Sequence, residues 1–356
     1  MARALALAAQ GLWTTSPNPR VGCVLVRDGE IIGEGWHRKA GEAHAEIEAL
    51  ADAKKRAPGR IAGATAYVTL EPCAHTGRTG PCVEALVKAG VGRVVAAMED
   101  PNPLVAGRGI AALRAAGIAV DTGPGAAEAA ELNVGFVSRM NRGRPWVRVK
   151  LAATIDGRTA LAGGESQWIT GPEAREDGHR FRARACAVLT GSGTIAIDDA
   201  RLTVRLPGVE RQPQRVVIDG ALRISPRSRV LACGETWIAT ASDDAAAAAP
   251  LQATGAELLH LPGADGRVDL VALLGELARR GINELHVEAG PRLAGALMAR
   301  GLVDELLCYL APGLIGDSGR GLISLPAPAS LSDRVALRWH DIRQVGSDLR
   351  VIARLD

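Results

Sequence analysis

Two stretches of this chain decide the fold of its first half: GEAHAEIEAL at residues 41–50 and TLEPCAHTGRTGPCVEAL at residues 69–86. They contain His44, Cys73 and Cys82, three residues of the types that bind zinc, and Glu46 follows the histidine by two positions. Zinc held by one imidazole and two thiolates keeps a fourth position open for water and lowers the pKa of that water to about 7. A carboxylate that is not a ligand can then move the proton. This arrangement is typical of zinc deaminases that act on nucleobases.

Each of these residues also has a purely structural interpretation. A His-x-Glu pair is common on helices, and a cysteine after a proline can be a buried thiol. The local pattern favours the metal site, because a helical pattern begins at His44, a strand is predicted over residues 65–70, and Cys73 lies in the turn that follows. The three ligands should therefore meet at the carboxyl end of a strand. The remaining cysteines lie in apolar surroundings and are predicted to be core thiols: Cys23, Cys186, Cys233 and Cys308.

The spacing of the two thiolates narrows the class of deaminase. Eight residues separate Cys73 from Cys82, whereas nucleoside and tRNA deaminases carry two. Together with SPNP at residues 16–19, VGCVLV at 21–26 and EDPNPLVAGRGI at 99–110, the string EPCAHTGRTGPC resembles the deaminase half of the RibD family of bifunctional riboflavin-biosynthesis enzymes. The resemblance runs from Met1 to about Met140. It implies a cytidine-deaminase-like three-layer domain, with Glu46 as the acid/base and Asn18, His75 and Arg78 as contacts to the substrate.

The length of the chain and a glycine- and proline-containing segment near its middle indicate two domains. A chain of 356 residues exceeds the usual size of one domain and can bury two cores. Glycine and proline interrupt the pattern at residues 141–145, before a new apolar strand begins at Trp146. We therefore predict a deaminase domain over residues 1–140 and a second domain over residues 145–356.

Composition excludes several classes of protein. The net charge of +3 and an aromatic content of 3% argue against a nucleic-acid binder, since phosphate needs a basic track and bases need aromatic surfaces. No stretch approaches the roughly 18 to 20 apolar residues of a membrane span. Six cysteines in a long chain fit a reducing compartment without disulfides. We expect a cytoplasmic protein that binds small molecules and not membranes, with homo-oligomerisation left open.

Strand and helix patterns alternate through both halves, which predicts layered α/β sheets. In the first half we expect strands near 21–26, 65–70, 92–98 and 118–121, with helices at 2–9, 44–56, 81–89, 107–116 and 126–133. In the second half we expect strands near 147–152, 186–190, 215–219, 236–240, 284–288, 303–311 and 348–354, with helices near 172–184, 267–280 and 291–300. The run Ala245 to Ala249 is predicted to be a linker or a short helix.

The second half has no histidine or cysteine cluster, so a second metal is not expected. It has a glycine-punctuated strand-to-helix junction at residues 286–296. Such a junction can bind a phosphate group at the helix N-terminus, but it can equally be a tight turn. The string TGSGT at residues 190–194 has the same two interpretations.

Four further strings resolve these alternatives. KLAATIDGRTA at residues 150–160, GESQWIT at 164–170, DDARLTVR at 198–205 and VEAGPRLAGAL at 287–297 resemble the reductase domain of the same family. The resemblance implies a dihydrofolate-reductase-like fold that uses NADPH. The implied NADPH contacts are Ala153, Trp168, Thr194, Asp198, Gly220, Gly290, Pro291, Arg292, Leu293, Ala294, Gly295 and Ala296. Gly220 stands where relatives carry a serine, so only its backbone remains for this contact.

The implied substrate-binding residues of the second domain are Ser166, Arg182, Leu202, Arg205 and Glu288. We expect Arg182 and Arg205 to pair with a sugar phosphate, and Glu288 to accept hydrogen bonds from hydroxyl groups. Lys150 and Asp198 lie near the right strings for a general acid, but the sequence does not compel either.

The resemblance therefore implies two reactions on pyrimidine ribosyl phosphates. The first is zinc-dependent deamination of 2,5-diamino-6-(5-phosphoribosylamino)pyrimidin-4-one. The second is NADPH-dependent reduction of the ribosyl group of the deaminated product. The alternatives are a cytidine-type or tRNA-adenosine deaminase fused to an unrelated domain, and a non-catalytic binding protein that keeps the fold.

Overall fold

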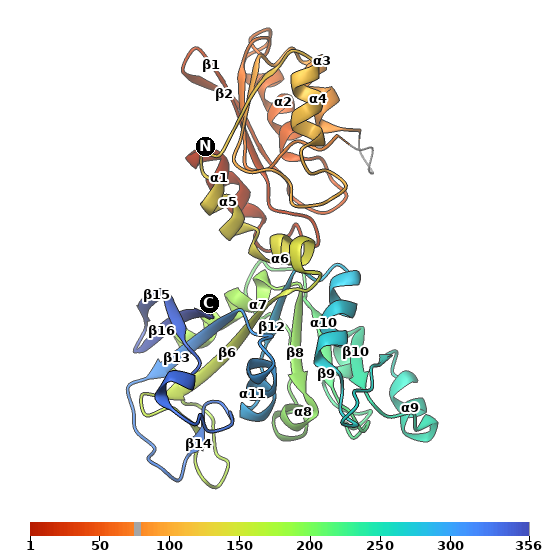
Figure 1. The fold of residues 1–356 in the computed structure, drawn as a ribbon, viewed down its shortest axis with the longest axis vertical. Helices are drawn as coiled ribbons and strands as arrows, with labels where there is room; N and C mark the ends of the chain where they lie inside the picture. Colours follow the sequence, from red (N-terminus) through yellow and green to blue (C-terminus); the bar gives the residue numbers. More distant parts are fainter. Residues whose placement is uncertain (75–79, 356) are drawn as a thin grey trace. The chain divides into compact units, whose positions relative to one another are not determined.

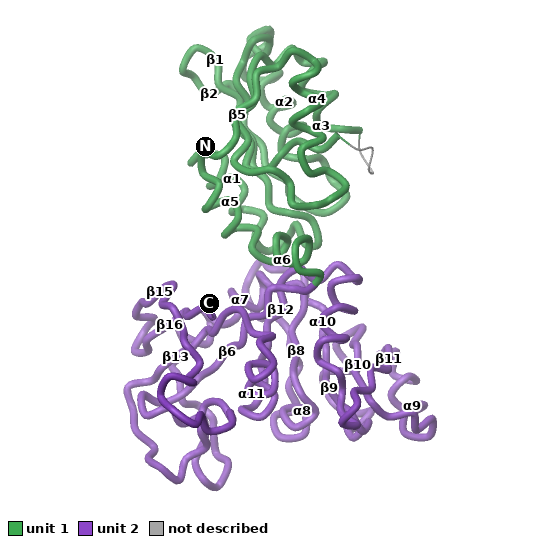
Figure 2. Tube along the Cα trace, viewed as in Figure 1, with its two compact units in different colours: residues 1–143 green, residues 144–356 purple. Residues whose placement is uncertain are grey.

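The computed structural model describes residues 1–74 and 80–355 of the chain. The fold divides into two compact units, Met1–Gly143 and Arg144–Asp356, which are coloured separately in Figure 2. Each unit has its own sheet and its own buried core.

The first unit is built on a five-stranded mixed sheet, seen edge-on in the upper part of Figure 1. Its strand order is β2-β1-β3-β4-β5. The pairs β1–β2 and β1–β3 are antiparallel, and β3–β4 and β4–β5 are parallel. The strands are β1 (Gly22–Arg27), β2 (Glu30–Trp36), β3 (Thr65–Val68), β4 (Arg93–Ala96) and β5 (Ala119–Thr122).

Helices cover both faces of this sheet and give the unit its three layers. Cys23 and Leu25 of β1 point into the core formed with α2, α3 and α4, whereas Val24 points to the opposite face and packs against α1. This alternation confirms the predicted three-layer arrangement. The helices are α1 (Ala2–Ala8), α2 (Ala45–Arg56), α3 (Cys82–Lys88), α4 (Arg108–Ala115), α5 (Ala126–Leu132) and α6 (Val134–Arg142), with a short 3-10 turn at Ala9–Gly11.

Strand β2 was not among the predicted elements, because EIIGEGW carries two glycines that weaken a strand pattern. The structure explains both glycines. A Cβ on Gly35 would lie 2.4 Å from the backbone nitrogen of Ala49, and a Cβ on Gly33 would lie 2.4 Å from the Ala49 carbonyl oxygen. The absence of side chains here lets α2 pack directly on β2, and this contact fixes the helix that begins after His44.

The second unit is built on a nine-stranded sheet of order β11-β10-β9-β8-β12-β6-β13-β16-β15. The strands from β11 to β13 run parallel, and β16 and β15 are antiparallel to their neighbours. The large strands are β6 (Trp146–Thr154), β8 (Ala187–Gly191), β9 (Gln214–Ile218), β10 (Thr236–Thr240), β11 (Glu257–His260), β12 (Glu284–Val287), β13 (Glu305–Ala311), β15 (Leu337–Val345) and β16 (Asp348–Leu355). A separate two-stranded sheet pairs β7 (Arg158–Ala160) with β14 (Arg320–Gly321).

Both faces of the large sheet are covered, as expected for parallel strands. Helices α10 and α11 pack on one face, and α7, α8 and α9 pack on the other. The helices are α7 (Pro172–Arg184), α8 (Ser192–Asp198), α9 (Ala245–Gln252), α10 (Leu270–Arg279) and α11 (Pro291–Ala299), and short 3-10 turns occur at Leu231–Cys233 and Leu331–Asp333.

Several boundaries differ from the sequence-based expectation for physical reasons. Helix α10 begins later than predicted because the Asp269 side chain accepts hydrogen bonds from Val271 and Ala272 and caps it there. Asp244 caps α9 in the same way, which makes a helix of the alanine run. Strand β15 was missed because it is an exposed edge strand that alternates apolar and charged residues irregularly.

The structure also corrects the prediction for the four isolated cysteines. Cys23 and Cys186 are buried as predicted, but Cys233 and Cys308 are only partly buried. Within the described part of the chain, no helix has the length and apolar character needed to cross a membrane.

Candidate active sites

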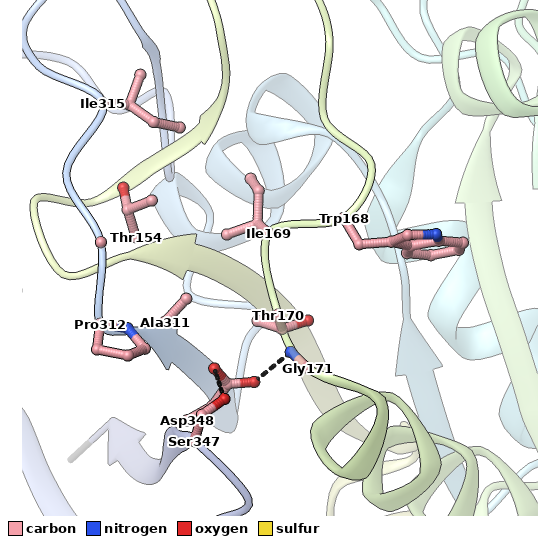
Figure 3. A pocket seen from close by; sticks show the side chains of 11 residues that line it. Thr154, Trp168, Ile169, Thr170, Gly171, Ala311, Pro312, Ile315, Ser347 and Asp348 are labelled. Carbon is pink, nitrogen blue, oxygen red and sulfur yellow. Dashed lines mark hydrogen bonds between the residues drawn. The ribbon is translucent and has the colours of Figure 1, made fainter.

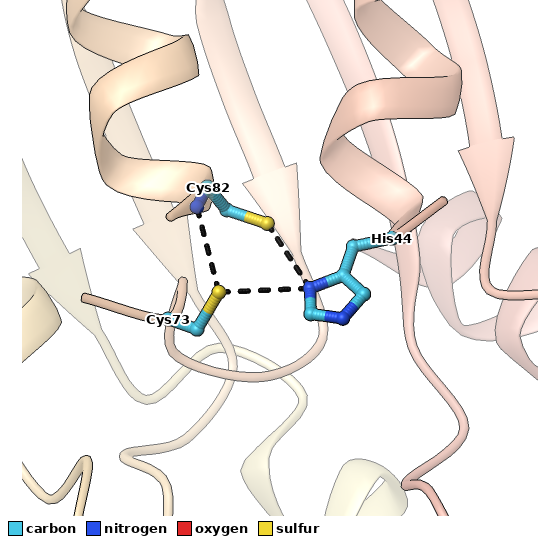
Figure 4. Close-up of side chains that lie close together, drawn as sticks. All are labelled: His44, Cys73 and Cys82. Atoms are coloured by element: carbon cyan, nitrogen blue, oxygen red, sulfur yellow. Dashed lines mark hydrogen bonds between the residues drawn. The ribbon is translucent and has the colours of Figure 1, made fainter. Parts of the chain in front are cut away.

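The first unit brings His44, Cys73 and Cys82 together from three segments (Figure 4). His44 is the residue before α2, Cys73 lies in the turn after β3, and Cys82 opens α3. The Nδ1 atom of His44 lies 3.2 Å from the Cys82 sulfur and 3.6 Å from the Cys73 sulfur. Two ligands at ordinary zinc bond lengths and tetrahedral angles lie about 3.6 Å apart. The donor set therefore fits zinc in both chemistry and spacing.

The two thiols act as one coupled pair. The backbone N–H of Cys82 donates to the Cys73 sulfur at 3.4 Å, at the N-terminus of α3. The hydrogen bond between the two cysteine side chains lowers the pKa of Cys73 and raises that of Cys82. One thiol of the pair is thus prepared to be a thiolate, which is the form that binds metal.

Glu46 lies in the first turn of α2 and is only 3% exposed. Burial is the main cause that raises its pKa to about 7, and the nearby Cys73 thiolate raises it further. The carboxyl group also lies within hydrogen-bonding reach of Cys82. A carboxyl group that titrates near neutrality beside a metal site is suited to both accept and return a proton.

Two residues next to this group carried no role in the sequence-based prediction. Glu71 is buried and accepts hydrogen bonds from the backbone N–H groups of Asp100, Gly107 and Ile110, at 3.0, 2.9 and 3.0 Å. It ties the segment before α4 to the turn that carries Cys73. The signal for it was a carboxylate at the end of an apolar strand, directly before Pro72.

His37, the second unassigned residue, follows β2, and its ring meets the His44 ring edge-on with centroids 5.3 Å apart. Its Nε2 atom is 3.0 Å from Nδ2 of Asn18, so the structure brings Asn18 close to the His/Cys/Cys group. The signal for His37 was a second histidine in GWHRKAGEAH, seven residues before His44. The other two predicted contacts of this domain, His75 and Arg78, lie outside the described residues.

In the second unit, the candidate site lies where paired parallel strands end. Strands β8 and β12 are neighbours, and the Thr190 hydroxyl donates to the Glu288 carbonyl oxygen at 2.6 Å. Helix α8 follows β8 directly, and α11 follows β12 after three residues. A Cβ on Gly191 would lie 3.4 Å from Leu293, so the starts of the two helices are adjacent.

These two junctions fit a dinucleotide phosphate. Ligands of open α/β sheets bind at the carboxyl ends of strands, where the chain order reverses and helix N-termini present free N–H groups. A Cβ on Gly193 or Gly290 would have open space around it, so a ligand can approach the backbone there. The junctions contain Thr194 and the predicted loop from Gly290 to Ala296.

The other predicted NADPH contacts are more scattered. Ala153 is buried near the end of β6, and Asp198 is the last residue of α8. Gly220 lies just beyond β9, next to β8. Trp168 is 69% exposed, and its ring is stacked under the guanidinium of Arg175 at 4.5 Å.

Trp168 also lines an open pocket of about 470 Å³ at the carboxyl ends of β6 and β13 (Figure 3). The Asp348 carboxylate closes one side of this pocket by accepting a hydrogen bond from the Gly171 N–H at 2.6 Å, at the start of α7. In Figure 3 the indole of Trp168 points away from the strand ends. The pocket is lined by Thr154, Trp168, Ile169, Thr170, Gly171, Ala311, Pro312, Gly313, Ile315, Ser347 and Asp348.

The predicted substrate residues Arg182 and Glu288 are brought together, but they pair with each other. Arg182 donates from Nε and Nη2 to the two Glu288 oxygens, at 2.7 Å each, and from Nη1 to the Thr203 carbonyl oxygen at 2.5 Å. This pairing holds the pKa of Glu288 well below its usual range in spite of burial. The guanidinium of Arg182 thus binds the Glu288 carboxylate, whereas the sequence-based expectation was that it binds a phosphate.

Arg205 differs from Arg182 although it lies nearby. Its backbone N–H donates to Nδ1 of His179 at 3.3 Å, but its guanidinium has no partner among the residues that the structure describes. Burial and the charge of Arg182 lower the pKa of Arg205, and burial with both arginines lowers that of His179 to about 4. The region therefore holds unneutralised positive charge beside Glu288. The two remaining predicted residues, Ser166 and Leu202, are partly and fully buried, respectively.

The layered fold of the first unit, with one histidine, two cysteines and a buried glutamate, defines a zinc-binding deaminase region. Residues 1–98 match the cytidine and deoxycytidylate deaminase zinc-binding region, and residues 145–351 match the RibD C-terminal domain. The chain is 50% identical to riboflavin biosynthesis protein RibD of Escherichia coli over 98% of this chain and 96% of that protein. It is 45% identical to the RibD protein of Haemophilus influenzae over 99% and 95% of the two chains. The chain belongs to the RibD family of riboflavin biosynthesis.

Solved structures agree over the whole length. RibD of Acinetobacter baumannii superposes with a TM-score of 0.92 at 41% identity and covers 100% of this chain and 97% of its own. A diaminohydroxyphosphoribosylaminopyrimidine deaminase/5-amino-6-(5-phosphoribosylamino)uracil reductase of Thermotoga maritima superposes with a TM-score of 0.88 at 32% identity, over 100% and 97% of the two chains. The second unit is thus a dihydrofolate-reductase-like pyrimidine reductase domain, and the alternative of an unrelated fused domain is wrong.

Proposed function

We propose that this chain performs two consecutive steps of riboflavin biosynthesis on one pyrimidine ribosyl phosphate. The first unit hydrolyses the 2-amino group of 2,5-diamino-6-(5-phosphoribosylamino)pyrimidin-4-one. The second reduces the ribosyl group of 5-amino-6-(5-phosphoribosylamino)uracil to ribityl. The observation that carries the proposal is the His44, Cys73 and Cys82 group with a buried carboxyl beside it, in a chain whose second unit is a pyrimidine reductase domain.

In the deaminase step, His44, Cys73 and Cys82 would hold one zinc ion. Zinc bound there supplies a hydroxide at neutral pH. Glu46 accepts the proton of the water at its carboxylate and returns it to the departing amino group. Because Glu46 is buried, the pKa of its carboxyl group is raised to about 7, so the group can both accept and donate the proton. Asn18 positions the pyrimidine ring.

In the reductase step, NADPH bound at the strand ends supplies the hydride, and the protein orients it. The backbone N–H groups at the starts of α8 and α11 would hold the phosphates of the cofactor, with Thr194 and the loop from Gly290 to Ala296 around them. Ala153, Trp168, Asp198 and Gly220 complete the cofactor site.

The substrate of the reductase binds beside Glu288. Arg205 is the better candidate for the sugar phosphate, because its guanidinium has no partner among the described residues, whereas Arg182 holds Glu288 in place. Lys150 lies on β6 within the electrostatic reach of Glu288 and Arg182, and burial lowers its pKa. That shift makes Lys150 a better proton donor than an exposed lysine, so we favour it over Asp198 as the general acid. Ser166 and Leu202 line the same site.

Thiolate ligands need a reducing environment, and all six cysteines are free in the structure. We therefore place the enzyme in the cytoplasm.

One incubation tests both activities. The purified zinc-loaded chain is supplied with the diaminopyrimidine phosphate, with and without NADPH, and the products are identified by mass. We expect ammonia and the uracil product without NADPH, and the ribityl product with it. Release of ammonia from cytidine or tRNA, with none from the diaminopyrimidine phosphate, would contradict the proposal.

A further inference from the structure

The hydrogen bonds of His37 determine which of its ring nitrogens carries a proton. Nδ1 lies 3.0 Å from the Ala43 carbonyl oxygen, and a carbonyl oxygen can only accept a hydrogen bond. Nδ1 must therefore carry hydrogen. His37 is 3% exposed, and its Nε2 faces Nδ2 of the Asn18 amide, a group that can only donate, so Nε2 is the acceptor of this contact.

The same contact determines the orientation of the Asn18 side-chain amide. Nε2 of His37 is 3.0 Å from Nδ2 of Asn18, so the NH2 end of the amide faces the histidine and donates to it. The Oδ1 end points the other way and has no hydrogen-bond partner among the described residues. Both residues are also held by their backbones, since Asn18 N–H donates to Thr15 and His37 N–H donates to Val21, each at 2.9 Å.

We propose that His37 is a positioning residue of the deaminase site: it orients the Asn18 amide so that Oδ1 is the free acceptor, and the site therefore selects a ring edge that carries an N–H donor. The inference rests on the deaminase activity proposed above. The diaminopyrimidine has such donors, namely the amino group on the reacting carbon and the ring N–H beside it. A ring that presents only acceptors at this edge meets the Oδ1 lone pairs and is rejected.

Two substitutions at His37 distinguish its proposed role in orienting the Asn18 amide from a role in supporting the metal ligand His44. In His37→Gln, the side-chain oxygen reaches the place of Nε2 and can still accept from Asn18. In His37→Asn, the shorter amide reaches the place of Nδ1, so it keeps the bond to Ala43 but leaves Asn18 without its partner. The Ala43 bond is the one that supports the neighbouring His44. The two variants thus keep opposite contacts: His37→Gln keeps the contact to Asn18 and loses the one to Ala43, and His37→Asn does the reverse.

The experiment uses the full zinc-loaded chain and measures kcat and KM of deamination, zinc content, and solvent exchange of the Asn18 side-chain amide by NMR, assigned by its absence in Asn18→Ala. For His37→Asn we expect KM to rise about tenfold with kcat within about twofold, full zinc, and loss of amide protection. For His37→Gln we expect KM and the protection of the Asn18 amide to stay close to those of the unmodified chain, because Asn18 keeps its partner.

An unchanged KM and a protected amide in His37→Asn would overturn the proposal. Loss of zinc in His37→Asn would also overturn it, because the role of His37 would then be to hold the segment before His44. If the unmodified chain fails to deaminate the diaminopyrimidine phosphate, the proposed function itself fails. The exchange measurement still reports on the orientation of Asn18 in that case.

Discussion

The two candidate sites differ in what their side chains contact. In the first unit, three metal-binding side chains face one another, with the buried Glu46 carboxyl beside them. In the second unit, Arg182, one of the two arginines expected to bind a phosphate, is already bound to Glu288 and to a backbone carbonyl. A metal site can thus be recognised from the types of its residues. A site for a phosphorylated substrate and a dinucleotide depends instead on which strand ends lie side by side and on which charged side chains remain unpaired.

The largest effect should come from removing a metal ligand. Cys73→Ser leaves two ligands, so zinc should be lost and deamination should fall to background. Elemental analysis measures the metal. The reductase activity of the same variant, assayed on the deaminated intermediate, is the control for folding. Retention of one zinc per chain would exclude Cys73 from the ligand set.

Glu46→Gln keeps the size of the side chain and removes its ability to carry a proton. We expect zinc to stay bound and deamination to fall by about 10²–10⁴-fold, which is the usual contribution of a general acid/base. Near-normal turnover in this variant would remove Glu46 from the mechanism.

Arg182→Gln and Arg205→Gln form a matched pair in the second unit. Removing Arg182 leaves the Glu288 carboxylate without its partner, so we expect a loss of about 3 kcal/mol of stability, measured by denaturant unfolding. Removing Arg205 breaks no side-chain pair with any residue that the structure describes, so the free energy of unfolding should stay the same while KM for the reductase substrate rises about tenfold. Equal effects of the two substitutions on stability would contradict the assignment of separate roles.

The pH dependence of stability should differ between the two sites. The folded pKa of Glu46 in the metal-free chain is raised to about 7 from 4.5, so the folded state holds a proton that the unfolded state releases. The zinc-free chain should therefore lose up to about 3 kcal/mol as pH rises from about 4.5 to 7. Glu288 has the opposite sign: its folded pKa is lowered, so its contribution is present above its ordinary pKa and is lost as pH falls below it.

Thermal unfolding of the zinc-free chain between pH 5 and 8 measures the first of these effects. Glu46→Gln, which carries no titrating group at this position, is the control and should show a flatter profile. An identical slope in both proteins would mean that Glu46 is not the titrating group.

The sequence predicted the zinc group well because its evidence is local. The strand before Cys73, the helix after His44 and the carboxylate two residues later all lie within short stretches. It missed β2, because the two glycines that let α2 approach look like strand breakers until the helix is in place. Glu71 was missed for a related reason: its partners are backbone N–H groups of residues 29 to 39 positions away.

The reductase site could be predicted only in part. The two glycine-containing strand-to-helix junctions could be recognised in the sequence. That they lie next to each other could not, because it depends on β12 pairing with β8, almost 100 residues earlier in the chain. The Arg182–Glu288 pair spans 106 residues and is not visible in any local pattern. Such long-range ion pairs decide which arginine has a guanidinium left to bind a ligand. The sequence alone therefore could not show that Arg182 pairs with Glu288.

We propose that the two catalysts of this chain work independently of each other. Removing zinc with a chelator and measuring both reactions on the same sample tests this independence. We predict that deamination is abolished and returns when zinc is restored, while NADPH oxidation with the deaminated intermediate continues at an unchanged rate. Loss of the reductase activity together with the metal would contradict the account.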